Sequence, residues 1–189
     1  MSEYHLPIMV DEVLKGLDIR SGGIYFDGTA GGGGHSFAIL ASDPTVRLIA
    51  TDKDGDAIKA VQERLTPFAG RYKLYRSDFK DYEKVLADAG VETLDGYLLD
   101  LGISSHQIDT RERGFAYMSD DAPLDMRMDD RSALTAETVV NEYSEEALMR
   151  ILREYGEETF AASIVRNLMR ERAKGRIATC GALRTVVEN

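Results

Sequence analysis

Four short apolar runs, each followed by a turn or a helical pattern, constrain the fold of this chain more than any other feature of its sequence. They cover Ile24 to Phe26, Arg47 to Thr51, Tyr72 to Tyr75 and Gly96 to Leu101, and β-branched and aromatic residues are frequent in them. Strands that alternate with helices pack as a parallel sheet with right-handed crossover connections. We therefore expect an α/β fold built on a parallel sheet.

Helical patterns with recognisable ends lie around the expected strands. Asp54 is placed to cap the helix after the second strand, and Gly90 to end a helix over Asp81 to Ala89. A loop rich in Ser, Asp, Arg and Gly then runs to about residue 132, and the remainder is helical, over 145–155, over 158–174 and from Thr179 onward. The sequence thus predicts a sheet domain over residues 1–132 and a helical domain over residues 133–189.

Charge and cysteine content restrict the class of protein. The chain has 23 basic and 33 acidic residues, and the net charge of −10 argues against a protein that coats itself with nucleic acid. A single cysteine, Cys180, excludes an internal disulfide, and no apolar run is long enough to span a bilayer. We expect a cytoplasmic protein that binds no membrane.

The charge is unevenly distributed. Residues 1–149 carry 15 basic and 28 acidic side chains, whereas residues 150–184 carry 8 and 4. Most of the local positive excess belongs to a basic cluster near the end of the chain, which consists of Arg166, Arg170, Arg172, Lys174 and Arg176. Such a cluster is either the solvated face of a helix or a contact surface for an anionic partner.

Residues 26–36 read FDGTAGGGGHS and lie between the first strand and the helical pattern His35 to Ala41. This placement argues against a flexible linker and for a turn that approaches a ligand, where a Cβ atom would block the approach. The dinucleotide fingerprint fits imperfectly, because Ser36 stands where a third glycine is required, and no Gly-Lys-Ser/Thr follows for a Walker A loop. The glycines alone therefore do not identify the ligand.

Two carboxylates narrow the choice of ligand. Asp52 ends the second strand, where an acidic group accepts hydrogen bonds from ribose hydroxyls, and this suits NAD and S-adenosylmethionine equally. Asp27 precedes the glycines, where a carboxylate repels a pyrophosphate but attracts a sulfonium or an ammonium group. The alternative is that Asp27 caps its own turn. We favour the methyl donor.

Acidic residues follow all four expected strands. Asp27, Asp52, Asp78 and Asp100 should converge, because the carboxyl ends of parallel strands lie on one edge of the sheet. Phe79, next to Asp78, either borders an adenine ring or belongs to the core. The sequence therefore predicts an acidic ligand site at this edge.

The segments DGTAGGGGHS, TDKD, LLDLGISSHQID, RGFAY and APLDMRMD, in this order, resemble the MraW family of bacterial S-adenosylmethionine-dependent methyltransferases, which modify the N4 amine of a cytidine in 16S (small-subunit) ribosomal RNA. The segments Tyr4 to Met9 and Tyr155 to Glu158 are similar as well. The resemblance implies a class I methyltransferase, Rossmann-like sheet with a helical insertion after the fourth strand. It implies donor contacts at Gly33, Gly34, His35, Asp52, Phe79, Asp100 and Gln107.

The chain departs from the family at its C-terminal end. Family members are longer and return to further strands, including a segment resembling ISFHSLEDR that is absent here. The last helical pattern also ends without a cap, which indicates a shortened chain. We therefore expect an incomplete sheet whose fourth strand is an unpaired edge, and such an edge favours aggregation.

By position, Asp100 is the candidate catalytic residue, because a carboxylate that accepts the protons of a cytosine amine makes its nitrogen a better nucleophile. Backbone carbonyls, Ser104 and Ser105 are further candidates. We expect no metal, since His5, His35 and His106 are not spaced as ligands.

The expected partner is small-subunit ribosomal RNA within the ribosomal subunit, and its target base must leave the stack. The basic cluster and four loop arginines are candidate phosphate contacts, the latter being Arg111, Arg113, Arg127 and Arg131. Residues Pro123 to Met128 form either a pocket lid or ordinary packing through Leu124, Met126 and Met128. Two other functions remain as alternatives, a non-catalytic RNA-binding or ribosome-assembly module and an NAD-dependent oxidoreductase.

Overall fold

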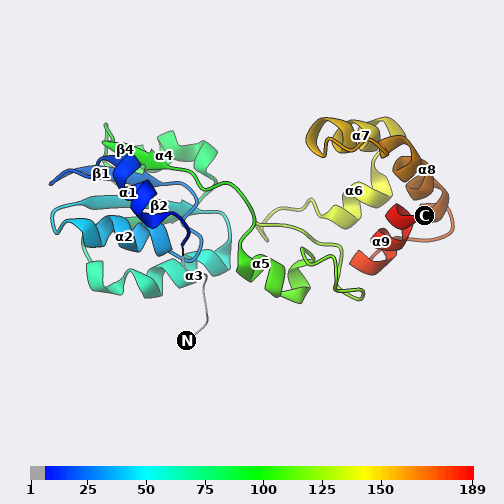
Figure 1. The fold of residues 1–189 in the computed structure, drawn as a ribbon, viewed down its shortest axis with the longest axis horizontal. Coiled ribbons are helices and arrows are strands. Elements are labelled where there is room, and N and C mark those ends of the chain that lie inside the picture. Colours follow the sequence, from blue (N-terminus) through cyan, green and yellow to red (C-terminus); the bar gives the residue numbers. More distant parts are fainter. Residues whose placement is uncertain (1–6) are drawn as a thin grey trace. The chain divides into compact units, whose positions relative to one another are not determined.

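The structure, a computed structural model, describes residues 7–189 and divides into two compact units, Met1–Ser104 and Ser105–Asn189 (Figure 1). Tyr4, His5 and Leu6 of the N-terminal motif lie outside the described residues. The division falls after Ser104, whereas the sequence predicts it at residue 132. The reason is that the loop before residue 132 joins the helices, since Leu124 N–H donates to the Ala178 carbonyl and Cys180 N–H to the Ala122 carbonyl, both at 3.0 Å.

The first unit is built on a four-stranded, entirely parallel sheet in the order β3-β2-β1-β4. In register, Phe26 of β1 lies beside Ile49 of β2 and Tyr97 of β4. The strands are β1 (Ile24–Asp27), β2 (Arg47–Asp52), β3 (Tyr72–Arg76) and β4 (Gly96–Leu98). The predicted parallel α/β fold is therefore confirmed.

Two helices of this unit begin or end at residues that capping chemistry favours. The Asp54 carboxylate accepts the Asp56 N–H, and Gly90 closes its helix with left-handed backbone, as predicted. The helices are α1 (Val10–Leu17), α2 (Gly34–Ser42), α3 (Gly55–Arg64) and α4 (Tyr82–Ala89), with 3-10 turns η1 (Thr66–Phe68) and η2 (Phe79–Asp81).

Successive side chains of each strand point to opposite faces of the sheet, and apolar residues are buried on both faces. Tyr25 and Leu48 belong to a buried cluster with residues of α1, α2 and α3, whereas their neighbours Phe26 and Ile49 pack with Val85 of α4. The sheet therefore lies between α4 and the other three helices, which fixes its carboxyl edge as a rim of loops.

Strand β4 is shorter than predicted, because it ends at Leu98 and not at Leu101. In the described part of the chain it is an edge strand, with β1 as its neighbour. Tyr97 and Leu101 are 69% and 68% exposed. Apolar side chains at an unpaired edge agree with the predicted incomplete sheet.

The second unit is helical. Its helices are α5 (Ser105–Asp109), α6 (Ala136–Glu142), α7 (Glu145–Arg150), α8 (Ala161–Arg172) and α9 (Cys180–Glu188), with a 3-10 turn η3 (Arg111–Arg113). Side chains of Ser144 and Thr179 cap α7 and α9, which confirms the predicted starts. Leu124, Leu148, Val165 and Val186 contribute to one buried core.

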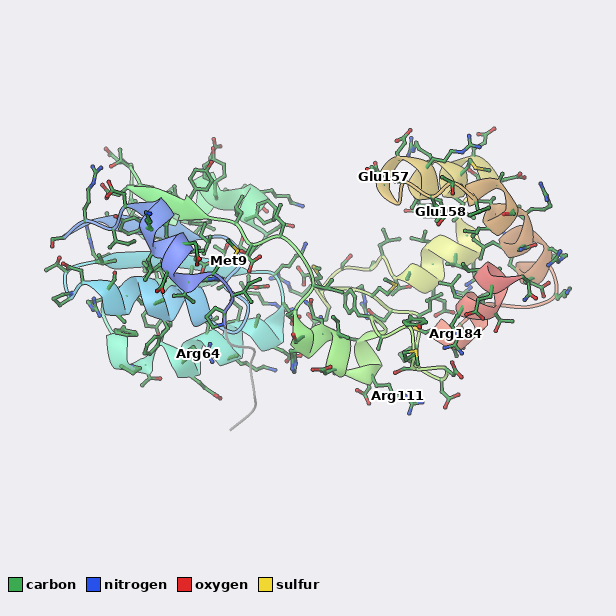
Figure 2. All side chains as sticks on the ribbon, in the orientation of Figure 1. Met9, Arg64, Arg111, Glu157, Glu158 and Arg184 are labelled. Atoms are coloured by element: carbon green, nitrogen blue, oxygen red, sulfur yellow. The ribbon has the colours of Figure 1, made fainter. Side chains whose placement is uncertain are left out.

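The connection between α7 and α8 contains unusual backbone. Helix α7 continues as a π-helix, η4 (Ile151–Tyr155), up to Gly156, and Glu157 has a φ of 49°. Glu158, labelled with Glu157 in Figure 2, accepts the Phe160 N–H at 2.7 Å. Because this contact shapes a turn, α8 begins at Ala161 and not at the predicted Glu158.

Candidate functional site

The carboxyl edge of the sheet has a topological switch point beside β1. The neighbours of β1 are β2 on one side and β4 on the other, so the connections that follow β1 and β3 cross the sheet in opposite directions. In open α/β sheets, ligands bind in the crevice that such a divergence creates. The glycine turn, Asp52, Phe79 and Asp100 all follow carboxyl ends of these strands, as the sequence predicts.

Glycine is required at two positions of the turn for different reasons. Gly33 has a φ of 76° and precedes α2, and a Cβ atom there would lie 3.3 Å from the Cα of Val61. Gly28 has no room for a Cβ atom, which would lie 2.5 Å from Leu99 and 2.9 Å from Phe79. Side chains at either position would therefore move the turn.

Asp27 lies beneath the turn and is only 1% exposed. Its Oδ2 accepts the Ser36 hydroxyl at 2.6 Å, and its Oδ1 accepts the Thr29 N–H at 3.1 Å. Burial raises the pKa of Asp27 to about 6 despite these hydrogen bonds. The contacts support turn capping, the alternative interpretation, and correct the favoured one, in which Asp27 faces the donor. Sequence reasoning missed the role of Ser36.

Asp52 joins the end of β2 to the glycine turn. Its Oδ2 accepts the Gly31 N–H at 2.8 Å and its Oδ1 accepts the Asp54 N–H at 2.9 Å. Burial raises the pKa of Asp52. Because each carboxylate oxygen has further lone pairs, Asp52 can still accept ribose hydroxyls while it holds the turn.

His35 and Asp100 approach each other above the start of α2. The His35 Nδ1 lies 4.0 Å from the Asp100 Oδ2, and its Nε2 lies 3.0 Å from the Ile8 carbonyl oxygen. The Asp100 side chain is 59% exposed. The Asp100 carboxylate is therefore exposed beside the glycine turn, and its contact with the donor remains a prediction.

Phe79 opens η2 after β3 and is half-buried. It packs against the cluster that contains Phe26 and lies close to Gly28. Its neighbour Asp78 accepts the Lys80 N–H and lies 3.8 Å from the Lys53 ammonium. Phe79 therefore packs against the core and also lies at the rim. Its contact with the adenine ring of the donor remains a prediction.

Gln107 lies on α5 in the second unit and is buried. The other six predicted donor contacts belong to the first unit. The structure therefore brings together Gly33, Gly34, His35, Asp52, Phe79 and Asp100 as one rim, and the role of Gln107 stays a prediction.

The loop arginines make contacts within their own unit. Arg111 pairs with Asp121, and Arg131 with Asp129 (Figure 2 labels Arg111). Arg113 donates to the carbonyls of Arg127 and Met128, and Arg127 to both carboxylate oxygens of Asp125. These side chains stabilise the loop through internal contacts. The sequence analysis, which interpreted them as phosphate contacts, did not anticipate this role.

The basic cluster is also largely engaged internally. Arg172 donates to the Tyr143 carbonyl at 2.7 Å, and Arg176 pairs with Glu137. Arg170 and Lys174 share Glu171. Within residues 7–189, the exposed Arg166 is the member of the cluster with neither an ion pair nor a hydrogen bond from its side chain, and phosphate binding by this cluster remains a prediction.

The segment Pro123 to Met128 divides between core and surface. Leu124 is buried in the core, whereas Met126 is 46% exposed and has a φ of 57°. The Met126 N–H donates to the Arg113 carbonyl at 3.0 Å. Leu124 is therefore part of the core, whereas Met126 lies at the surface.

Replacing Met126 by glycine is expected to stabilise the second unit by about 1 kcal/mol, because left-handed backbone disfavours a Cβ atom. Urea denaturation followed by circular dichroism measures this change. Met118→Gly is the matched control, since Met118 is also exposed but has no positive φ. An equal loss of stability in both variants would contradict the assigned strain.

From residue 7 onward, no three His, Cys, Asp or Glu side chains are grouped so that they could hold a metal ion. In the same range, every helix is too short or too polar to cross a membrane.

The parallel sheet, the glycine turn after β1 and the acidic end of β2 define a Rossmann-like α/β domain. The chain belongs to the MraW methylase family, whose model matches residues 2–189.

Curated relatives are similar over almost the whole chain. "Ribosomal RNA small subunit methyltransferase H 2" of Agathobacter rectalis is 50% identical over 186 residues, which are 97% of this chain and 59% of the relative. "Ribosomal RNA small subunit methyltransferase H" of Symbiobacterium thermophilum is 44% identical over 189 residues, 100% of this chain and 59% of the relative. The chain thus spans about three fifths of the length of these relatives.

Among solved structures, a precorrin methyltransferase domain from Rhodobacter capsulatus is similar at 18% identity, with a TM-score of 0.43, over 58% of this chain and 56% of that one.

Proposed function

We propose that the first unit binds S-adenosylmethionine and that the chain takes part in methylating the N4 amine of a cytidine in 16S ribosomal RNA. The observation that carries the proposal is the rim itself, where the exposed Asp100 carboxylate stands beside the glycine turn that Asp52 holds. The names of the curated relatives support ribosomal RNA of the small subunit as the substrate. The work would take place in the cytoplasm, on RNA within the ribosomal subunit.

The chemistry of the rim fits a cationic donor. Asp52 holds the glycine turn through the Gly31 N–H and has lone pairs left for ribose hydroxyls. Asp52 and Asp100 make the site acidic, which favours a sulfonium and an ammonium group over a pyrophosphate. This preference supports the methyl donor against NAD.

In this proposal the donor supplies an electrophilic methyl group, and the protein supplies position and charge. Asp100 accepts a hydrogen bond from the attacking amine and stabilises the positive charge that develops on its nitrogen. His35 lies close enough to restrict the orientation of that carboxylate. Positioning contributes most of the remaining rate acceleration, because the accepting nitrogen must lie about 3–3.5 Å from the methyl carbon.

Isothermal titration calorimetry with S-adenosylmethionine, S-adenosylhomocysteine and NAD tests the proposal. We expect binding of the first two and none of NAD. Incubation with S-adenosylmethionine and small ribosomal subunits, followed by mass spectrometry of the RNA, then tests methyl transfer. Tight binding of NAD alone would refute the proposal, whereas donor binding without methylation would favour a non-catalytic RNA-binding or assembly module.

Asp100→Asn is expected to lower single-turnover methyl transfer about tenfold at saturating donor, because a neutral amide stabilises the developing charge less than a carboxylate. Single-turnover assays with labelled donor measure this. Glu63→Gln, which removes an exposed carboxylate on α3, is the control and should leave the rate unchanged. An unchanged rate and donor affinity in Asp100→Asn would exclude the catalytic assignment.

A further inference from the structure

Thr29 makes hydrogen bonds in two directions from the glycine turn. Its backbone N–H donates to the Asp27 Oδ1 at 3.1 Å, and its side-chain Oγ1 accepts the backbone N–H of Asp100 at 2.7 Å. The second bond joins residues 71 positions apart in the sequence. Thr29 therefore connects the buried carboxylate beneath the turn to the segment that carries the exposed one.

This bond stands where the sheet ladder ends. The Gly28 N–H donates to the Leu98 carbonyl at 3.0 Å, which extends the pairing of β1 with β4 by one bond. Two residues after Leu98, the Asp100 N–H donates to the Thr29 hydroxyl. A side-chain oxygen thus replaces a main-chain acceptor at the point where the chain leaves the sheet.

The position of the Asp100 carboxylate depends on this hydrogen bond to its backbone. Its side chain is mostly exposed, and a contact of 4.0 Å to His35 restrains it only weakly. Leu99, the preceding residue, lies against Gly28, so its side chain and the Thr29 bond hold the same short segment. Where the backbone of Asp100 lies therefore decides where its carboxylate lies.

We propose that Thr29 is a positioning residue of the donor site, whose hydroxyl holds the backbone of Asp100 and so fixes the Asp100 carboxylate beside the glycine turn. The inference rests on the proposed function, because that function gives the Asp100 carboxylate a ligand to contact. It assigns to the turn a second task, the placement of a carboxylate from another strand.

The test compares Thr29→Val, which keeps the shape of the side chain but loses the oxygen, with Thr29→Ser, which keeps the oxygen. Calorimetry with S-adenosylmethionine should show about tenfold weaker binding for Thr29→Val and affinity near that of the unmodified chain for Thr29→Ser. Hydrogen exchange of peptides covering 99–103 should be faster in Thr29→Val alone, because the Asp100 N–H loses its acceptor.

A double-mutant cycle with Asp100→Ala separates positioning from a general structural effect. If Thr29 acts through Asp100, Thr29→Val should change donor affinity little once the carboxylate is absent. A full tenfold loss in both backgrounds, or equal binding by Thr29→Val and the unmodified chain, would overturn the inference while the proposed function stands. No binding of S-adenosylmethionine by the unmodified chain would refute the proposed function and the inference with it.

Discussion

Gly33→Ala is expected to weaken the binding of S-adenosylmethionine about a hundredfold and to destabilise the first unit by about 3 kcal/mol. The left-handed backbone of Gly33 costs a residue with a Cβ atom about 1–2 kcal/mol, and the approach of that atom to the backbone of Val61 costs a further 1 kcal/mol or more. Backbone cannot move aside as a flexible side chain can. The turn must therefore shift, and the start of α2 with it.

Calorimetry measures the affinity in this experiment, and hydrogen exchange of peptides from β1 and β2 measures the stability. Gly16→Ala is the matched control, since Gly16 lies inside α1 and a Cβ atom there would have no heavy atom within 4 Å. That control should gain about 0.5–1 kcal/mol, because alanine favours a helix interior. If Gly33→Ala behaved like Gly16→Ala, the turn would not be the rigid element that its geometry indicates.

Asp27→Asn is expected to remove a pH dependence of stability between about pH 4 and pH 6. Burial raises the pKa of Asp27 from its usual value near 3.8 to about 6 in the folded chain. The folded state therefore holds the proton more tightly than the unfolded state, and the resulting stabilisation is complete below the unfolded pKa. It is lost as the pH rises through 6, by about 3 kcal/mol at about 1.4 kcal/mol per pKa unit.

Urea denaturation of both forms at a series of pH values measures this effect. The unfolding free energy of the unmodified chain minus that of Asp27→Asn should fall as the pH rises from 4 to 7. Asp43→Asn provides a contrast of opposite sign, because hydrogen bonds from Ser21 and Thr45 lower the pKa of Asp43 to about 2. There the stabilisation is present above the unfolded pKa and is lost below it. A difference for Asp27→Asn that is constant with pH would contradict the buried, titrating carboxylate.

Local chemistry made much of the fold predictable from the sequence. Asp54, Ser144 and Thr179 accept N–H groups of the first turn of their helices, and Gly90 takes the left-handed backbone that ends one. Each of these contacts lies within a few residues of its own position, so the sequence contains both partners side by side. The strand end bearing Asp52 followed from the same periodic pattern, whereas β4 ends two residues before Asp100.

Contacts between distant residues were less predictable. Asp27 turns inward because Ser36, nine residues later, offers a buried hydroxyl, and sequence spacing alone does not say that the two meet. By charge alone, the loop arginines are candidate phosphate contacts. In the structure, Asp125 and Asp129 form ion pairs with two of them, Arg127 and Arg131. Strand β4 ends at Leu98, and beyond it the Asp100 N–H donates to the Thr29 hydroxyl, a long-range contact that sequence spacing does not predict.

The internal pairing of the arginines has a consequence for ionic strength. The salt dependence of RNA binding grows with the number of phosphates that a protein neutralises, because each one releases condensed counterions. Arg127, Arg131 and Arg176 already have carboxylate partners within the second unit, so RNA that met them would exchange one anion for another. Binding through this unit would then respond only weakly to added salt, and recognition would depend on the shape of the RNA more than on its charge.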